Sequence, residues 1–403
     1  MIDFKAREAR GGRAYRRIVI ASCICVLAII LVAGLWPLHV PSNKVSWLSN
    51  RNGLIFGHEG SIVSAGALRP REPEGDTSGS LEIWLVPSQI NQSKTILSFD
   101  GSAHPGKAFS IHQDKAALRI EQNNVDEQGV SRTAWFTVGG VFRQKRPVLV
   151  TITLGKQDTL VYVDGVLTKK FSLLGVSRNS FTGRIVVADS PFTSNSWSGQ
   201  ILGLAICYRQ LSAAQVKQHW EGWIKKQHPT FVKDEVPVAS YLFNEGKGSI
   251  AHNELDSVTD LIIPSRYSVL HPSFLLAPWR EYKSTWSYWS DFGVNVAGFI
   301  PWGFCLAAYF SSVRVINRPR VTTITLGFVV SFTIEVLQAL LPTRSSGTTD
   351  LMTNTLGTAI GMAFYSCSFA KDLLARLGRA LGDFAQESSR GEESRSCEVV
   401  SAI

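Results

Sequence analysis

Two kinds of hydrophobic pattern divide the chain. Four runs of 18 to 21 residues are apolar and, apart from Glu335, uncharged; they cover 18–35, 292–311, 321–341 and 351–369. A helix of that length crosses the ~30 Å hydrocarbon layer of a membrane. Between the first two runs, apolar and polar residues alternate over short stretches separated by turn residues, which is typical of strands. The pattern predicts a four-helix transmembrane bundle and a separate all-β sandwich.

The first apolar run has an alternative interpretation as a cleaved signal peptide. The run is long, and Trp36-Pro37-Leu38-His39 follows it where a cleavage site would need small residues. Ile20-Ala21-Ser22-Cys23 resembles a lipoprotein cleavage box, but its cysteine precedes most of the apolar stretch. We therefore expect an uncleaved anchor.

Basic residues predict the orientation of the helices. They cluster before the first run, between the second and third, and after the fourth, at 5–17, 314–320 and 371–379. With four spans, all three clusters fall on one side, which the positive-inside rule makes cytoplasmic. The long segment 38–290 and the short loop 342–350 are then extracytoplasmic.

The sequence also suggests domain boundaries. We expect a basic N-terminus, a first helix, a sandwich, a connector with extra strands, a helical bundle and a cytoplasmic tail, over 1–17, 18–37, 45–225, 226–290, 291–370 and 371–403. Asp164-Gly165 between β-branched residues predicts a hairpin. Ser212 and Gln215 form a capping-box pattern that predicts a helix at the end of the sandwich.

The connector and the tail carry further signals. Val238–Gly246 and Leu261–Pro264 predict additional strands in the connector. Tryptophans and tyrosines crowd its end as an interfacial aromatic belt, at Trp279, Tyr282, Trp286, Tyr288 and Trp289. In the tail, helical spacing of leucines predicts an interfacial helix before a disordered end.

Composition narrows the function. The net charge of +9 invites a nucleic-acid interpretation, but the basic residues flank apolar runs instead of forming one patch with aromatics, so we expect no nucleic-acid partner. Cys207 is the single cysteine of the segment 38–290, so that segment forms no internal disulfide. No Cys/His spacing resembles a zinc site, and we expect no resident metal or other cofactor apart from the weak calcium alternative below.

Three segments of the β region resemble the laminin-G-like, concanavalin A-like jelly roll. They are Ser80-Leu-Glu-Ile-Trp84, Leu160-Val-Tyr-Val-Asp-Gly165, and Trp197–Ile206 followed by Leu211–Val216. The resemblance implies a sugar-binding fold. The aromatic candidates for stacking on a sugar are Trp135, Phe136 and Trp197, with membership of the core as the alternative for each.

Metal and hydrolase alternatives rest on carboxylates of the same segment. Asp100, Asp164 and Asp189 are candidate Ca²⁺ ligands in loops, although no calcium-loop motif is present. Glu254-Leu-Asp256 is the nearest match to the paired carboxylates of glucanases on this fold, but it lies in an expected turn. We therefore name no catalytic residue.

A polar pattern repeats in the predicted bundle. Asp291, Asn295 and Gly298 recur with the same spacing as Asp350, Asn354 and Gly357. Four residues separate each Asp from its Asn, so the two lie on one helix face. The topology gathers a cluster near one level of the outer leaflet: Asp291, Asn295, Glu335, Gln338, Arg344, Asp350 and Asn354. Intramembrane carboxylates usually face a bundle interior, so the cluster is either a ligand site or a structural clamp between helices.

Four motifs in order resemble the VanZ-like family: Asn295–Gly303, Ser331–Gln338, Leu341–Arg344 and Asp350–Gly357. That family usually has four helices, of which 18–35 would supply the first; the inserted β region departs from its pattern. The resemblance implies a multi-pass protein of the bacterial cytoplasmic membrane, in a family named after a glycopeptide (teicoplanin) resistance trait.

We expect a non-enzymatic envelope protein whose outer domain binds a glycan, a glycolipid or a protein. One alternative is a membrane enzyme that acts on a lipid-linked substrate through Glu335, Asp350 and Arg344. Another is a structural interaction protein without a small ligand. The sequence leaves the oligomeric state open.

Overall fold

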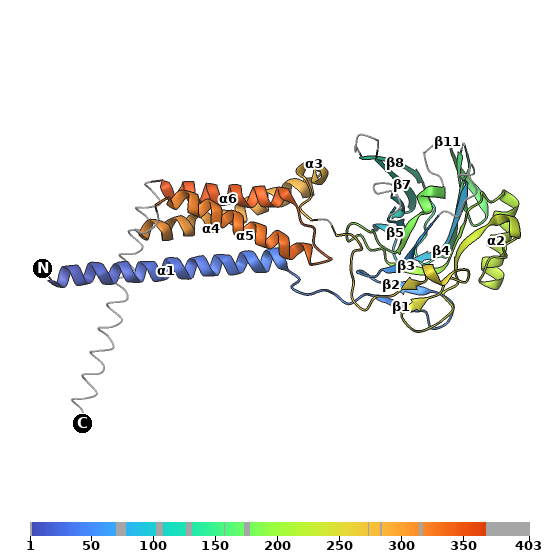
Figure 1. The fold of residues 1–403 in the computed structure, drawn as a ribbon, viewed down its shortest axis with the longest axis horizontal. Helices are drawn as coiled ribbons and strands as arrows, with labels where there is room; N and C mark the ends of the chain where they lie inside the picture. Colours follow the sequence, from blue (N-terminus) through green and yellow to red (C-terminus); the bar gives the residue numbers. More distant parts are fainter. Residues whose placement is uncertain are drawn as a thin grey trace, which may run out of the picture. The chain divides into compact units, whose positions relative to one another are not determined.

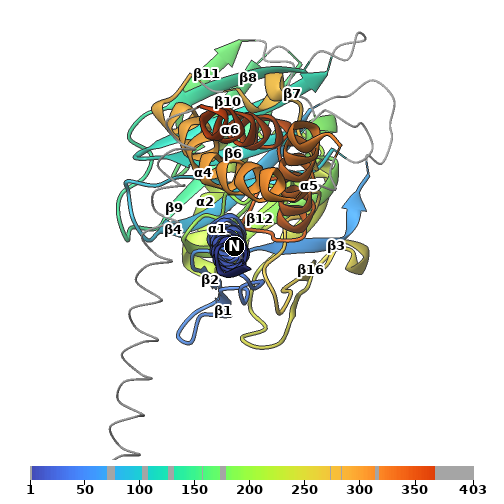
Figure 2. The ribbon, with the colours of Figure 1, turned by 90° about the vertical axis from the view of Figure 1, so that its left-hand side faces the viewer.

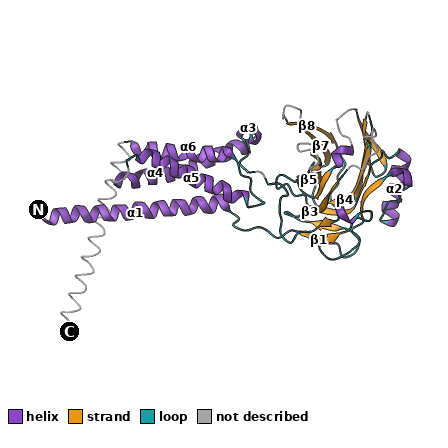
Figure 3. Cartoon of the chain, viewed as in Figure 1, coloured by secondary structure: helices purple, strands orange, loops and turns teal. Residues whose placement is uncertain are grey.

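The computed structural model describes residues 2–69, 78–101, 108–125, 131–156, 158–172, 178–272, 274–282, 284–313 and 317–367. The predicted tail 371–403 and Arg314 of the basic loop lie outside these residues. The chain divides into a helical unit, Met1–His39 with Ser273–Ile403, and a β unit, Val40–Pro272. Figure 3 separates the two by secondary structure.

Two antiparallel sheets form the described part of the β unit (Figure 1). The first follows the order β1 (Val45–Trp47), β2 (Leu54–Phe56), β13 (Gly199–Cys207), β4 (Gly79–Pro87), β9 (Val148–Leu154), β10 (Asp158–Val163) and β11 (Val166–Ser172), with β14 (Pro237–Tyr241) also paired to β13. The second follows the order β15 (Ile250–Ala251), β16 (Leu261–Ile262), β3 (Ile62–Leu68), β12 (Gly183–Val187), β5 (Ser93–Phe99), β6 (Phe109–Asp114), β7 (Ala117–Val125) and β8 (Ser131–Val138). The predicted sandwich is confirmed.

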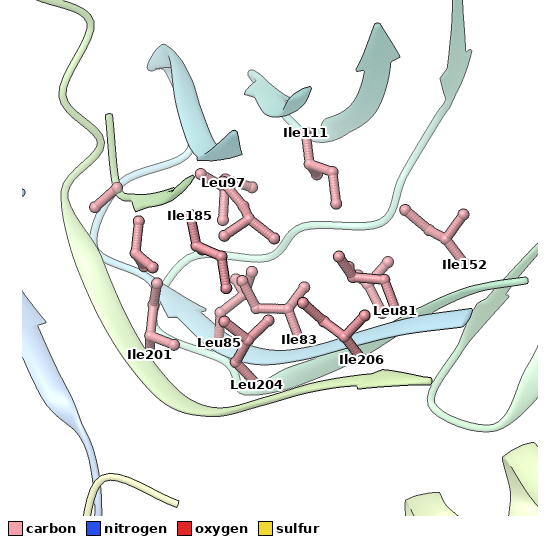
Figure 4. Close-up of a cluster of buried hydrophobic side chains, with 14 of the residues drawn as sticks. Leu81, Ile83, Leu85, Leu97, Ile111, Ile152, Ile185, Ile201, Leu204 and Ile206 are labelled. Carbon is pink, nitrogen blue, oxygen red and sulfur yellow. The ribbon is translucent and has the colours of Figure 1, made fainter. Parts of the chain in front are cut away.

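Aliphatic side chains from both sheets fill the space between them. Leu81, Ile83 and Leu85 alternate along β4 and are fully buried, because a strand turns every second side chain to the same face. They meet Leu97 and Ile185 of the second sheet in one continuous core (Figure 4). The fold therefore rests on burial of apolar surface, without a disulfide among the described cysteines.

Local signals in the sequence are confirmed by the structure. Asp164 and Gly165 both adopt positive φ, at 51° and 77°, and join β10 to β11 as a hairpin. Ser212 and Gln215 form the predicted capping box at the start of helix α2 (Ala213–Lys226). The strands expected in the connector also form, but β14 and β16 pair with β13 and β3. The β unit thus extends to Pro272, beyond the expected boundary at 225.

Helix α2 covers the outer face of the first sheet through a buried charged group. Trp223 packs against Leu149 and Ala205 there. Beside it, the imidazole of His219 lies between two carboxylates: Nδ1 is 3.1 Å from Glu82 Oε2 and Nε2 is 3.2 Å from Glu235 Oε2. All three side chains are at most 2% exposed. They link α2 to strand β4 and to the 3₁₀ helix Lys233–Glu235.

The geometry of His219 calls for the charged imidazolium. A neutral ring carries one N–H, so both nitrogens can donate to carboxylates only when the ring is protonated. Burial lowers the pKa of His219, but the hydrogen bonds and charges of Glu82 and Glu235 outweigh burial and raise the pKa above its ordinary value of 6.5. The pKa of the Cys207 thiol is raised, mainly by burial and further by the negative charges of Glu82 and Glu235.

Five described helices belong to the helical unit: α1 (Ile2–Leu35), α3 (Pro278–Glu281), α4 (Trp286–Ser312), α5 (Pro319–Ala339) and α6 (Thr348–Ser366). Figure 2 views the unit from its left-hand side in Figure 1, with α4, α5 and α6 grouped. Glycines let α4 and α6 approach closely: a Cβ on Gly357 or Gly361 would collide with the Val296 or Ile300 carbonyl. Gly298, by contrast, faces open space.

Three helices of the described chain are long and apolar enough to cross a membrane: Tyr15–Leu35, Trp286–Ser312 and Pro319–Ala339. The fourth predicted span coincides with α6. This helix forms, but it is not among the three that are long and apolar enough to cross a membrane. Its surface toward the neighbouring helices is made of small and polar residues, such as Thr353, Asn354 and Thr358, which are buried inside the unit. Length and apolarity thus support three of the four predicted spans, and not all four.

We predict that residues 40–272 fold alone, whereas the shorter segment 45–225 does not. The shorter segment lacks Tyr241, Phe243 and Leu261, which are at most 1% exposed in the core. Loss of a buried aromatic side chain alone costs about 3–5 kcal/mol, against a typical total stability of about 5–15 kcal/mol. Circular dichroism and urea unfolding of both segments test this. Equal cooperativity and stability would contradict it.

We also predict that alkaline pH destabilises the β unit through His219. A raised folded-state pKa stabilises fully below the unfolded value of 6.5, and the contribution is lost as the pH rises through the folded value. The melting temperature of 40–272 should therefore fall above pH 6.5. His219→Gln should lower stability by about 3–5 kcal/mol, because it leaves buried carboxylates without a cation, and should remove the alkaline slope.

Asp189→Asn is the matched control. Burial raises the pKa of Asp189 to about 6, so the cost of ionising it grows between pH 3.8 and about 6 and is complete above that range. The asparagine variant should change the slope only in this acidic window. An unchanged alkaline slope in His219→Gln would refute the assignment.

Candidate functional site

Strands β6, β7 and β8 present a polar face on the outer side of the second sheet. Their core-facing positions hold Phe109, Ile111, Leu118, Ile120, Phe136 and Val138. The intervening positions point the other way, and the strand registers align them across the sheet. Ser110 lies opposite Glu121, which lies opposite Trp135; His112 lies opposite Arg119, which lies opposite Thr137. Two adjacent rows of polar side chains result.

Hydrogen bonds hold the first part of this face in place. His112 Nε2 lies 2.8 Å from Ser110 Oγ and 3.3 Å from Glu121 Oε2. On the other side of the ring, Nδ1 lies 3.1 Å from Thr95 Oγ1. Asn195 Nδ2 donates to the same hydroxyl at 2.8 Å, so the network continues into the loop after β12. These side chains are therefore fixed before any ligand arrives.

An exposed tryptophan ends the polar face. Trp135 is 57% exposed on the edge strand β8. The guanidinium of Arg119 lies over its ring, 4.9 Å from the centroid, and forms an ion pair with Glu121. The pKa of Glu121 is lowered, mainly by its hydrogen bond to His112. Burial acts to raise this pKa, but the charges of His112 and Arg119 also lower it. Glu121 thus remains a carboxylate that orients Arg119 against Trp135.

The other two aromatic candidates lie in the core. Phe136 is 7% exposed and packs on Phe171 of the opposite sheet, with ring centroids 3.9 Å apart. Trp197 is fully buried and donates from Nε1 to Gln113 Oε1 at 2.6 Å. Phe136 is buried because successive side chains of a strand point to opposite faces. Its neighbour Trp135 faces outward, so Phe136 faces the core. Of the three candidates, Trp135 alone offers a ring to a ligand.

The three candidate calcium ligands are engaged by protein donors at separate places. Asp189 accepts hydrogen bonds from the backbone of Ser190 and Asn195 and, at 2.5 Å, from the hydroxyl of Tyr267. Asp100 accepts from the Arg184 backbone, and its Oδ2 lies 3.1 Å from the ring of His271. Asp164 accepts from the backbone N–H of Leu149, on the neighbouring strand β9. Within the described residues no group of three or more acidic, His or Cys side chains is arranged to hold a metal.

The polar cluster of the helical unit satisfies backbone groups at helix ends. Gln338 of α5 donates to the Gly34 carbonyl at 2.8 Å. Arg344 donates from Nε to the Trp36 carbonyl at 2.9 Å, and its Nη2 reaches the same oxygen. Both carbonyls lie at the end of α1, where a helix leaves its last carbonyls without internal partners. The side chains of Gln338 and Arg344 therefore cap α1.

Carboxylates perform the same role at the start of α6. Glu335 is 1% exposed and accepts from the backbone N–H of Gly347 at 2.8 Å. Glu281 accepts from the N–H of Thr349 at 2.9 Å. Negative charge is favourable at a helix N-terminus, where the free N–H groups point outward. Glu281 was not among the predicted residues; it lies 68 positions away in sequence and no motif marks it.

Contacts between helices complete the cluster. Asn295 of α4 donates to Asp350 of α6 at 2.7 Å, and Asn354 donates to Ser331 of α5 at 3.0 Å. Arg344 is exposed, and its bonds go to the backbone of α1 and not to Glu335. Asp291 is exposed at the second turn of α4. The amide oxygens of Gln338 and Asn354 are buried without a hydrogen-bond partner among the described residues.

Comparisons with known proteins cover both units. Residues 249–371 match the model of the family VanZ/LLP1, and residues 64–217 match the model of the concanavalin A-like lectin/glucanases superfamily. A comparison with curated proteins finds no match. The VanZ-like match begins at residue 249, before helix α3, and reaches the end of the described chain.

Several solved structures are similar at low identity. The receptor binding domain of botulinum neurotoxin D is 15% identical, with a TM-score of 0.33, over 46% of this chain and 48% of that one. A proposed carbohydrate binding protein from Bacteroides ovatus is 12% identical, with a TM-score of 0.35, over 57% and 62%. A SAP-like pentraxin from Limulus polyphemus is 12% identical, with a TM-score of 0.32, over 55% and 93%. The chain spans less than two thirds of the first structures that it matches.

At these TM-scores, the assignment of the fold rests on the strand order and on the family matches. Both matched families are those that the sequence motifs resemble, and they occur in the predicted order. Residues 64–217 are therefore similar to the concanavalin A-like lectins and glucanases, and residues 249–371 are similar to the VanZ/LLP1 family.

Proposed function

We propose that this chain is a bacterial cell-envelope membrane protein whose β unit binds a glycan on the face of strands β6 to β8. The observation that carries the proposal is the exposed ring of Trp135 beside polar side chains that are already hydrogen-bonded in place. A sugar offers C–H groups to an aromatic ring and hydroxyl groups to neighbouring polar atoms. The face supplies both kinds of partner within three adjacent strands.

Preorganisation supports this choice of site. Arg119 is held by Glu121, and His112 is held by Ser110 and Thr95. A ligand therefore binds without the entropic cost of ordering long side chains. The matched superfamily includes lectins by name, which agrees with a carbohydrate ligand.

The proposed location is the bacterial cytoplasmic membrane, with the β unit outside the cell. The three basic clusters of the sequence would then face the cytoplasm. In this arrangement α6 serves as the fourth span. Its small and polar residues are buried against α4 and α5, so they are shielded from lipid as a membrane interior requires.

The VanZ-like helices would hold the glycan-binding unit at the membrane and contact an amphiphilic or lipid-linked envelope molecule. A contribution to envelope homeostasis or to teicoplanin-type glycopeptide resistance belongs to this proposal. The acid–base enzyme is the weaker alternative, because Glu335 and Arg344 are both occupied by backbone groups. A clamp that holds helix ends accounts for the same contacts.

We predict that Trp135→Ala weakens glycan binding more than tenfold. Truncation of an aromatic anchor costs about 2 kcal/mol or more, which weakens binding more than tenfold. A glycan array with residues 40–272 identifies the ligand, and calorimetry on that ligand measures the loss. Trp135→Phe should retain part of the affinity, because the ring remains.

Leu167→Ala is the control for this experiment. Leu167 is also an exposed apolar side chain, 50% exposed, on β11 of the other sheet. Its variant should bind like the wild type. Unchanged affinity of Trp135→Ala, or the absence of any glycan ligand for a folded β unit, would reject the site.

We further predict that Glu335→Gln is tolerated, whereas Glu335→Leu is not. The glutamine oxygen can still accept from the Gly347 N–H, but leucine leaves this buried donor unpaired at a cost of about 1–3 kcal/mol. Membrane abundance and thermal stability in detergent measure the effect, and sensitivity to glycopeptides measures function. Loss of function in Glu335→Gln at normal abundance would instead favour the enzyme.

A further inference from the structure

A small cavity lies where α4 and α6 end and α5 begins. Its volume is about 190 Å³, and its lining includes Ala307, Ser311, Arg320, Thr323, Tyr365 and Ser366. One water molecule needs only about 10–15 Å³ by this kind of measure. The cavity therefore has room for a group as large as a phosphate with part of what is attached to it.

Cations gather at this end of the helical unit. Arg318 and Arg320 lie at the start of α5 and are exposed. Arg16 and Arg17 of α1 reach the same end, because the guanidinium of Arg16 lies over the ring of Tyr309, near the end of α4, at 5.8 Å from the centroid. Among the described residues, no ion pair involves any of these four arginines.

The acidic residues of the same three helices lie at the opposite end. Helices α4, α5 and α6 contain one carboxylate each, Asp291, Glu335 and Asp350. Fifteen residues separate Arg320 from Glu335, and fifteen separate Asp350 from Tyr365. At 1.5 Å per residue, each separation is about 22 Å. An anion in the cavity would therefore meet arginines and lie far from the carboxylates of α4, α5 and α6.

We propose that this cavity binds the phosphate of an anionic membrane phospholipid, with Arg320 as its principal cation. Basic pockets between transmembrane helices are suited to acidic lipid headgroups. Arg320 contributes its charge and N–H donors, and the Ser311 hydroxyl contributes a further donor. The competing account is structural: Arg320 would merely complement the last carbonyls of α4 and α6, where a cation is also favourable.

Lipid binding by the full chain in nanodiscs separates these accounts. Nanodiscs of phosphatidylcholine, with a few per cent of a fluorescent phosphatidylglycerol, report how strongly the anionic lipid concentrates around the protein. The wild type should enrich phosphatidylglycerol over a matched phosphatidylcholine probe. Arg320→Gln should reduce that enrichment about fivefold, the size expected for one basic residue at an anionic surface. Arg320→Lys should retain part of it, because the charge remains.

Arg143→Gln is the charge-matched control, since Arg143 is an exposed arginine of the β unit. It should leave the enrichment unchanged. Inorganic phosphate is added as a competitor: displacement of the lipid at millimolar phosphate would identify a free-phosphate site and overturn the lipid assignment. Unchanged enrichment in a folded Arg320→Gln would overturn it too, and a fall in stability without a fall in enrichment would establish the structural account.

Both leaflets of a nanodisc carry the same lipid. The result therefore does not depend on the orientation of the chain or on glycan binding by the β unit.

Discussion

The ends of helices are the constraint on which the membrane region depends. A helix leaves four N–H groups at its start and four carbonyls at its end without internal partners, and where these groups are buried between helices or lie in the bilayer core no water is available to bond them. Polar side chains from other helices meet this need: Gln338 and Arg344 bond the end of α1, and Glu335 and Glu281 bond the start of α6. These four residues join α1, α3, α5 and α6 into one unit. Side chains that donate hydrogen bonds contact the carbonyl groups, and carboxylates that accept them contact the N–H groups.

This constraint explains why acidic and amide residues occur in otherwise apolar helices. Carboxylates accept hydrogen bonds and stand at the N-terminus of α6, whereas donors stand at the carbonyls of α1. Asn295 and Asn354 perform the remaining bridging between helices. The repeated Asp–Asn spacing in α4 and α6 thus has a structural reason in α6, where Asp350 accepts a hydrogen bond from Asn295. The counterpart Asp291 is exposed and holds no such position.

Most of the architecture could be predicted from the sequence because it rests on local periodicity. The four apolar runs became α1, α4, α5 and α6, and Asp164-Gly165 formed the hairpin that its backbone preferences favour. Partners that are distant in sequence could not be predicted. Glu82 and His219 are 137 residues apart and carry no shared motif. The same holds for Arg344, whose partner is the Trp36 carbonyl and not the carboxylate of Glu335.

Strand periodicity also decides which aromatic residues remain free. Trp135 and Phe136 are neighbours, yet one is exposed and the other packs on Phe171, because successive side chains of β8 point to opposite faces. The sequence named both without the register that separates them. Trp135 also differs from an ordinary exposed side chain in its neighbours. The guanidinium of Arg119 lies over its ring, Glu121 forms an ion pair with Arg119, and His112 in turn contacts Glu121. A solvated tryptophan without such neighbours would have to order its own partners on binding. Here the side chains around Trp135 are already ordered by folding, so ligand binding does not have to order them. For this reason the face of β6 to β8 is the strongest candidate for ligand recognition in the β unit.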